Sequence, residues 1–149
     1  MANSIFAVAE SEYDEITDVW EASVRATHHF LAEEHILYFR PLIRNEYLKA
    51  VKLFCTKSDG AITGFIGTGP GIIEMLFIRP DARGKGIGRL LTAFSINDLG
   101  VTKVDVNEQN AQAAGFYEKM GFAVVGRSEL DGLGLPYPIL HMELKQLTI

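Results

Sequence analysis

The sequence predicts a mixed α/β domain in which a central sheet of about seven strands is flanked by about four helices. Apolar runs of strand length alternate along the chain with segments of helical periodicity. The run Ile72–Ile78 is apolar at every position but one, which is typical of a strand inside a sheet. A glycine-rich loop, Arg83–Gly88, then leads into a helical apolar stripe. The length of 149 residues and the 48% hydrophobic content predict one globular domain over residues 1–149.

The N-terminal half is expected to hold one strand, two helices and two further strands. Ser11, followed by acidic residues, is a typical helix start. Pro41 lacks a backbone N–H and is expected to kink the second helix. The predicted elements are a strand over Ile5–Ala9, helices through Tyr13–Val24 and Ala32–Ala50, and strands over Val51–Thr56 and Ile62–Thr68.

The C-terminal half is expected to alternate strands with helices. A helix follows the glycine loop, and Asn110 is placed to cap another that Gly121 ends. Short turns between the three clustered strands predict antiparallel pairing, and the later strand–helix–strand units predict parallel pairing. The remaining strands are expected at Ile72–Ile78, Val101–Val106, Phe122–Val125 and Tyr137–Leu144.

Composition and charge exclude several classes of protein. A net charge of −5 argues against nucleic-acid binding and favours a cationic or neutral partner. No apolar run approaches the roughly 20 residues of a membrane span, and no signal peptide is visible. The single cysteine, Cys55, excludes an internal disulfide and is compatible with the cytoplasm. His28 and His29 point about 100° apart on a helix, and no other metal-ligand spacing is present, so we expect no metal.

The glycine loop is the clearest functional motif. Glycines allow a sharp turn and close backbone approach to a ligand, and the first amides of the following helix favour a phosphate. Arg83, Lys85 and Arg89 add positive charge. An ordinary tight turn before a helix is the structural alternative. The sequence lacks the nucleoside triphosphate loop pattern, Gly-x-x-x-x-Gly-Lys-Ser/Thr.

A dinucleotide site is a second alternative for this loop. Asp105 lies about 20 residues beyond it, where a ribose-binding acid is expected. That fingerprint, however, places its first glycine directly at the strand end, whereas here five residues, Arg79–Arg83, intervene. Arg89 also stands at the position of the third glycine.

Two motifs together resemble the GCN5-related N-acetyltransferase (GNAT) superfamily. The first is Arg-x-x-Gly-x-Gly, ending at Gly88. The second is Asn-x-x-Ala-x-x-Phe-Tyr-x-x-x-Gly-Phe, which runs from Asn110 to Phe122 about 20 residues later. Further stretches, including Ser23–Leu31, are similar to the bacterial YjaB-type branch of this superfamily. The resemblance covers nearly the whole chain and implies a GNAT-like sheet that splays open beside its central strand.

The resemblance implies a coenzyme A site built on the central strand and the glycine loop. The strand backbone is expected to bond the pantetheine amides, and the loop amides to bind the pyrophosphate. Asn110 is expected either to reach the pantetheine arm or to act only as a helix cap. The implied residues for acetyl-CoA are Leu76, Phe77, Ile78, Arg83, Gly84, Lys85, Gly86, Ile87, Gly88, Arg89, Asn110 and Tyr117.

Two residues are implied in catalysis. Tyr117 corresponds to the general acid of the family, although a phenol with a pKa of about 10 is a weaker acid than a thiol near 8.5, so a hydrogen bond to developing negative charge is an alternative role. Glu74, the lone charge in an apolar strand, is a candidate general base for the acceptor ammonium. The structural alternatives are a buried aromatic packing residue for Tyr117 and, for Glu74, a paired carboxylate or a residue at a bulge.

The expected activity is transfer of an acetyl group from acetyl-CoA to a primary amine of a small molecule, peptide or protein. A non-catalytic acyl-CoA sensor is the alternative, and it would require neither Tyr117 nor Glu74. The sequence leaves the acceptor open and is compatible with a monomer or a homodimer. Residues implied at the acceptor side are His28, His29, Tyr38, Ser128 and Tyr137.

Overall fold

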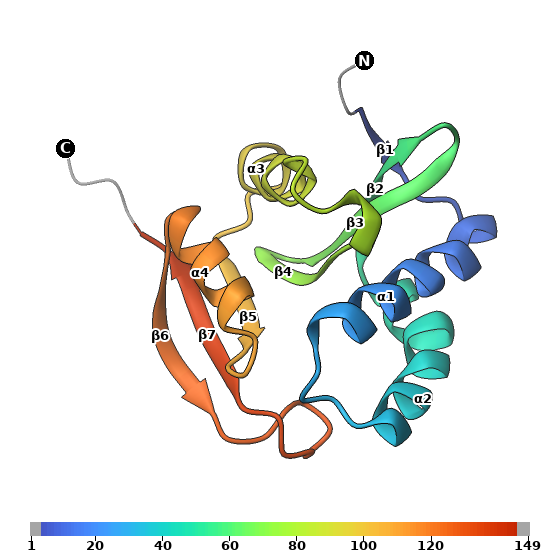
Figure 1. Ribbon diagram of the computed structural model, residues 1–149. Coiled ribbons are helices and arrows are strands. Elements are labelled where there is room, and N and C mark those ends of the chain that lie inside the picture. The colour runs from blue at the N-terminus through green and yellow to red at the C-terminus, as the bar shows by residue number, and fades with distance from the viewer. Residues whose placement is uncertain (1–3, 146–149) are drawn as a thin grey trace.

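The computed structural model describes residues 4–145, which form a seven-stranded mixed sheet with two helices against each face (Figure 1). The order of strands across the sheet is β1-β2-β3-β4-β5-β7-β6. The predicted order of elements along the chain is confirmed. The elements are β1 Ile5–Ala7, α1 Tyr13–Thr27, α2 Glu33–Leu42, β2 Lys52–Ser58, β3 Ala61–Gly69, β4 Ile72–Ile78, α3 Ile87–Leu99, β5 Lys103–Asn107, α4 Ala111–Lys119, β6 Phe122–Ser128 and β7 Ile139–Leu144.

Pairing between strands agrees with the prediction except at the C-terminal end. Strands β2, β3 and β4 are antiparallel, and the β4–α3–β5 unit is parallel. The expected parallel pairing of β5 with β6 is wrong, because β7 lies between them and pairs antiparallel with both. The expected strand over Tyr137–Leu144 begins only at Ile139, because Tyr137 belongs to the preceding loop.

The sheet splays open between β4 and β5. These parallel strands pair only at Ile72 with Lys103 and at Ile73 with Val104, and then they separate. In Figure 1, β5, β7 and β6 swing away from the hairpin of β3 and β4. Over Leu76–Ile78, the β5-facing backbone edge of β4 therefore has no strand partner within the described part of the chain.

A β-bulge at Glu74 turns β4 over. Met75 pairs with Gly67 and Ile73 pairs with Thr68, so Glu74 is the extra residue. Ile73 consequently packs into the core beneath α3 and α4, whereas Met75 packs into the core beneath α1 and α2. In a regular strand these residues, two apart, would face the same way.

Each face of the sheet has its own apolar core. Trp20 and Ile16 of α1 pack with Phe65 beneath the first pair of helices. Leu91 of α3 and Phe122 pack beneath the second pair. At the usual 25 cal/mol per Å² of buried apolar surface, cores of this kind are the main stabilising term of the fold. The described part of the chain has no helix that is long and apolar enough to cross a membrane.

The segment expected as one kinked helix over residues 32–50 is helical throughout but changes its winding. Helix α2 ends at Leu42, directly after Pro41, and continues as a π-helical turn over Ile43–Tyr47 and a 3-10 turn over Leu48–Ala50. Proline removes one backbone donor, and the wider turn accommodates the loss of that hydrogen bond.

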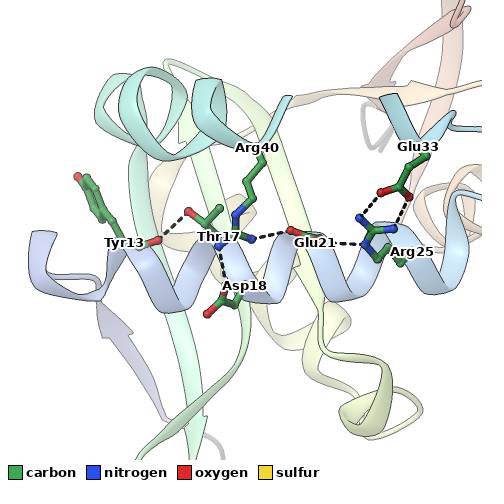
Figure 2. Close-up of polar contacts among 7 residues, drawn as sticks. All are labelled: Tyr13, Thr17, Asp18, Glu21, Arg25, Glu33 and Arg40. Carbon is green, nitrogen blue, oxygen red and sulfur yellow. Dashed lines mark hydrogen bonds and ion pairs between the residues drawn. The ribbon is translucent and has the colours of Figure 1, made fainter. Parts of the chain in front are cut away.

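Ion pairs hold α2 against α1 (Figure 2). Arg40 donates to Asp18 and Glu21, at 2.7 Å each. Arg25 donates to Glu21 at 2.8 Å and to both carboxylate oxygens of Glu33, at 2.6 and 2.9 Å. Glu21 therefore connects the two arginines, and the network fixes how the helices approach the sheet.

Candidate active site

A cavity of about 470 Å³ lies where the sheet splays, against the α3 and α4 side of β4. It brings together eleven of the twelve residues expected at the coenzyme, all except Lys85. Its lining consists of Ser23, Thr27, His28, Leu76, Phe77, Ile78, Ala82, Arg83, Gly84, Gly86, Ile87, Gly88, Arg89, Asn110, Gln112, Ala113, Phe116 and Tyr117.

The glycine loop presents backbone amides to this cavity. Gly84 and Gly86 have φ values of +77° and +81°, in the left-handed region where other residues are strained. The amide of Leu90 makes the first hydrogen bond of α3, to the Gly86 carbonyl at 2.9 Å. The amides that precede it are therefore free of intrahelical bonds and lie at the positive end of the helix dipole.

The positive side chains of the loop are available to a ligand. Five of the seven arginines form ion pairs with carboxylates, whereas Arg83 and Arg89 form none within residues 4–145. Both line the cavity, and no carboxylate from residues 4–145 does. Lys85 is exposed on the same loop but outside the lining. This combination of amides and unpaired cations suits a phosphate or pyrophosphate.

Asn110 acts as the predicted helix cap and still faces the cavity. Its Oδ1 accepts a hydrogen bond from the Ala113 amide at 3.1 Å. The side-chain NH₂ group remains available to a ligand, because an amide has separate donor and acceptor ends. One residue thus fits both roles that the sequence allowed.

Tyr117 is buried, with 6% of its surface exposed, and lies between Phe116 and Phe122. Its hydroxyl forms no hydrogen bond with any residue that the structure describes. Burial raises the pKa of the phenol above its ordinary value, so the group remains protonated at neutral pH. It can therefore donate a hydrogen bond into the cavity.

A second cavity of about 390 Å³ lies on the α1 and α2 side of β4. Glu74 and Asp131 line it, and no lysine or arginine of the described chain does. The side-chain oxygen of Asn107 is buried here and has no hydrogen-bond partner within the described chain. The lining consists of Trp20, Val24, His28, Leu31, Phe39, Ile43, Tyr47, Ala50, Val51, Glu74, Met75, Phe77, Asn107, Asp131, Tyr137 and Ile139.

The sequence predicts that Glu74 is buried in a strand covered on both faces, and the structure shows instead that it is exposed. The bulge carries its side chain out over Gly69, and the residue is exposed. The pKa of the carboxyl is nevertheless raised, first by partial desolvation and then by the negative charge of Asp105. A raised pKa brings the group closer to the working range of a general base.

Among the residues that the structure describes, His28 and Phe77 are the two that line both cavities. His28 lies at the end of α1, with its ring centroid 6.2 Å from that of Phe77. Burial, reinforced by His29, lowers the pKa of His28 to about 4. The imidazole is therefore neutral at physiological pH.

The other residues expected at the acceptor side take different places. Tyr137 lines the second cavity, but its hydroxyl pairs with His35 Nδ1 and accepts from the Ala32 amide at 3.3 Å. This contact joins the loop before β7 to the start of α2. His29 and Tyr38 are exposed and line neither cavity.

Ser128 also lies outside both linings. It belongs to a chain of hydrogen bonds in which Ser128 Oγ and His141 Nε2 are 2.7 Å apart and His141 Nδ1 and Asp105 Oδ1 are 2.7 Å apart. This chain crosses β6, β7 and β5. After partial desolvation, the charge of its Asp105 is the second cause of the raised pKa of Glu74.

Sequence reasoning missed three polar residues of the second cavity or its rim, namely His35, Asn107 and Asp131. His35 is 102 positions from its partner Tyr137, so no local pattern indicates the contact. Asp131 belongs to a turn in which its Oδ1 accepts from the amides of Leu133 and Leu135, at 2.9 Å each. Its aspartate–glycine pair predicts a turn but not a cavity.

The splayed sheet, the amide-rich loop and the free edge of β4 together define an acyl-CoA-dependent acyltransferase. The family model described as "Acetyltransferase (GNAT) domain" matches residues 18–145, and the chain belongs to this family. It is an acetyl-CoA-dependent N-acetyltransferase. The alternative of a dinucleotide site at the glycine loop is not supported, because the acetyltransferase family model covers that loop.

Two relatives and one solved structure are closely similar. The chain is 39% identical to peptidyl-lysine N-acetyltransferase YjaB of Escherichia coli K12, over 95% of this chain and 97% of that protein. It is also 39% identical to the Salmonella typhimurium LT2 protein of the same name, over 88% and 90%. The solution structure of apo YjaB from E. coli superposes with a TM-score of 0.88, at 37% identity, over 99% of this chain and all of that one. A Thermoplasma acidophilum PaiA N-acetyltransferase in complex with coenzyme A shares the fold, with a TM-score of 0.75 and 20% identity over 96% and 99% of the two chains.

Proposed function

We propose that the acceptor is the side-chain amine of a lysine in a peptide or protein, and that it attacks acetyl-CoA directly while both are bound. The observation that carries this proposal is a pair of cavities of opposite charge that meet at His28 and Phe77. Two arginines line one, which suits the anionic coenzyme, and two carboxylates line the other, which suits an ammonium. The YjaB relatives are named peptidyl-lysine N-acetyltransferases.

Direct attack is further supported by the position of the only thiol. Cys55 is fully buried in the core between the sheet and α1. Burial raises the pKa of its thiol to about 11. A buried, protonated thiol is a poor nucleophile, and it does not line either cavity. A ternary complex is therefore favoured over a thiol-bound acetyl intermediate.

Within this proposal, Tyr117 donates a hydrogen bond to the negative charge that develops on sulfur. Because burial makes the phenol a weaker acid, donation of a hydrogen bond is favoured over early proton transfer. Glu74 attracts the lysine ammonium and takes its first proton, either directly or through water. The loop amides with Arg83 and Arg89 hold the pyrophosphate, and the edge of β4 at Leu76–Ile78 bonds the pantetheine amides.

The test is release of free coenzyme A thiol with three acceptors. These are a blocked peptide with one lysine, the same peptide with norleucine in place of lysine, and a small diamine. We expect turnover with the lysine peptide and none with the norleucine peptide. Preference for the diamine would overturn the proposed acceptor. Stabilisation by acetyl-CoA without turnover on any amine would support the sensor alternative.

We propose a bacterial cytoplasmic setting, which the bacterial origin of the named relatives supports. The acidic net charge of −5 supports cationic protein segments rather than nucleic acid as partners. A monomer or a homodimer remains our expectation.

A further inference from the structure

His28 is the polar side chain at the junction of the two cavities, because its only companion there is the apolar Phe77. A lysine that enters from the acidic cavity must pass this junction to reach a thioester in the other one. A polar group at the junction is therefore placed to contact the reacting nitrogen. Glu74, by contrast, lines only the second cavity, which also contains Asp131.

Counting protons assigns the tautomer of His28. The Thr27 hydroxyl has a single proton, and it donates this proton to the Ser23 carbonyl at 2.9 Å. Thr27 Oγ1 also lies 2.8 Å from His28 Nδ1, so in this bond it must accept. Nδ1 therefore carries the imidazole proton, and Nε2 carries a lone pair.

That lone pair is free for a substrate. Nε2 has no hydrogen-bond partner within residues 4–145, and no carboxylate pairs with the ring. Burial keeps the ring neutral, so it does not repel an arriving ammonium. A neutral hydrogen-bond acceptor at the junction suits the neutral amine, whereas the carboxylates of the second cavity suit the charged ammonium.

We infer that His28 Nε2 accepts a hydrogen bond from the neutral lysine amine and takes its proton as the nitrogen attacks, an inference that rests on the proposed function. The lone pair of the amine forms the N–C bond with the acetyl carbon, and the C–S bond breaks with its electron pair on sulfur. The second N–H proton passes to Nε2, while the thiolate leaves with a hydrogen bond from Tyr117. Solvent then protonates the thiolate and removes the proton from His28.

This step does not require a strongly basic imidazole. A nitrogen that has bonded to a carbonyl carbon gives up its proton far more readily than an alkylammonium, because the product amide is scarcely basic. Glu74 removes the first proton, before attack, and His28 removes the second, during it. Acetyl transfer thus uses two proton acceptors in sequence: Glu74 in the second cavity and His28 at the junction of the two cavities.

Two substitutions separate this role from a merely structural one. In His28→Asn the amide NH₂ can still donate to Thr27, but nothing lies at the ε position. His28→Gln restores an oxygen near that position and loses the contact with Thr27. We expect His28→Asn to lower kcat by about 100-fold with little change in the KM for acetyl-CoA, and His28→Gln to recover part of the loss. If His28 only holds Thr27, the order is reversed, with His28→Asn close to wild type.

The tautomer is tested on the unmodified protein, independently of activity. Two-dimensional ¹H–¹⁵N spectra of the imidazole rings distinguish a protonated Nδ1 from a protonated Nε2, and the His28→Asn variant assigns the signal. We expect a neutral ring with the proton on Nδ1 at pH 7. A protonated Nε2 would overturn the inference. A wild-type enzyme that acetylates no lysine peptide refutes the proposed function, and with it this step, whereas a fully active His28→Asn variant refutes the step alone.

Discussion

We expect the hydroxyl of Tyr117 to be important for activity and nearly dispensable for folding. Its ring packs between two phenylalanines, whereas its hydroxyl has no hydrogen-bond partner in the described chain. Removal of that oxygen leaves no protein group unsatisfied. The packing and the chemistry of Tyr117 can therefore be separated by experiment.

We expect Tyr117→Phe to lower kcat by about 100-fold while the free energy of unfolding changes by less than about 0.5 kcal/mol. Thiol release and urea denaturation measure the two quantities. Tyr13→Phe is a matched control, because Tyr13 is also partly buried against the core but lines neither cavity. Unchanged turnover in Tyr117→Phe would remove the phenol from the mechanism.

The carboxyl of Glu74 gives a prediction about pH. Asp105 helps to raise its pKa, so Asp105→Asn should lower that pKa while keeping an oxygen to accept from His141. The carboxylate form then persists to lower pH, and the acid limb of the pH–rate profile moves to lower pH. In a Glu74→Gln background, which lacks the titrating carboxyl, the same substitution should leave the pH–rate profile unchanged. If the acid limb moves equally in both backgrounds, a group other than Glu74 is responsible for it.

At the scale of elements, the glycine loop and α3 offer a matched pair of substitutions. Gly86 begins the helix and Gly100 ends it, with φ values of +81° and +70°, and a Cβ on either would meet no atom within 4 Å. Left-handed backbone costs other residues about 1–2 kcal/mol. Both alanine variants should therefore lose similar stability.

Only Gly86→Ala should also weaken binding of acetyl-CoA, by about tenfold if the loop moves to relieve roughly 1.4 kcal/mol of strain. Isothermal titration calorimetry measures the affinity, and thermal melting measures the shared loss of stability. Equal affinity in the two variants would contradict the assignment of the loop amides to the pyrophosphate.

The contact between α1 and α2 predicts how stability depends on pH. Arg25, and then Arg40, lower the pKa of Glu21 below its ordinary value of 4.5. The unfolded chain therefore binds this proton more tightly, so the stabilisation is complete above about pH 4.5 and is lost as the pH falls through the lower, folded pKa. Glu21→Gln should lose about 0.5 kcal/mol at pH 7 and less at pH 3. Urea denaturation at both values tests this, with the exposed Glu118→Gln as a control that should show no such difference.

At the scale of the whole molecule, local patterns predicted the elements but not where they meet. The apolar run of β4 and the glycine loop predicted most of the residues that the structure gathers around the first cavity, because both lie within one stretch of chain. The bulge at Glu74 depends on the register with β3, which periodicity within β4 does not reveal. The contact of Tyr137 with His35 and the insertion of β7 depend on residues far apart in sequence.

The position of β7 in the sheet has a consequence for how the protein is made. It is the last strand along the described chain, yet it is an interior strand that pairs with both β5 and β6. During synthesis, β5 and β6 therefore leave the ribosome with no partner between them. A chain that is truncated before Ile139, during translation or by a protease, exposes strand edges that are prone to aggregation. We therefore expect shortened chains to be degraded rather than to persist as weaker enzymes.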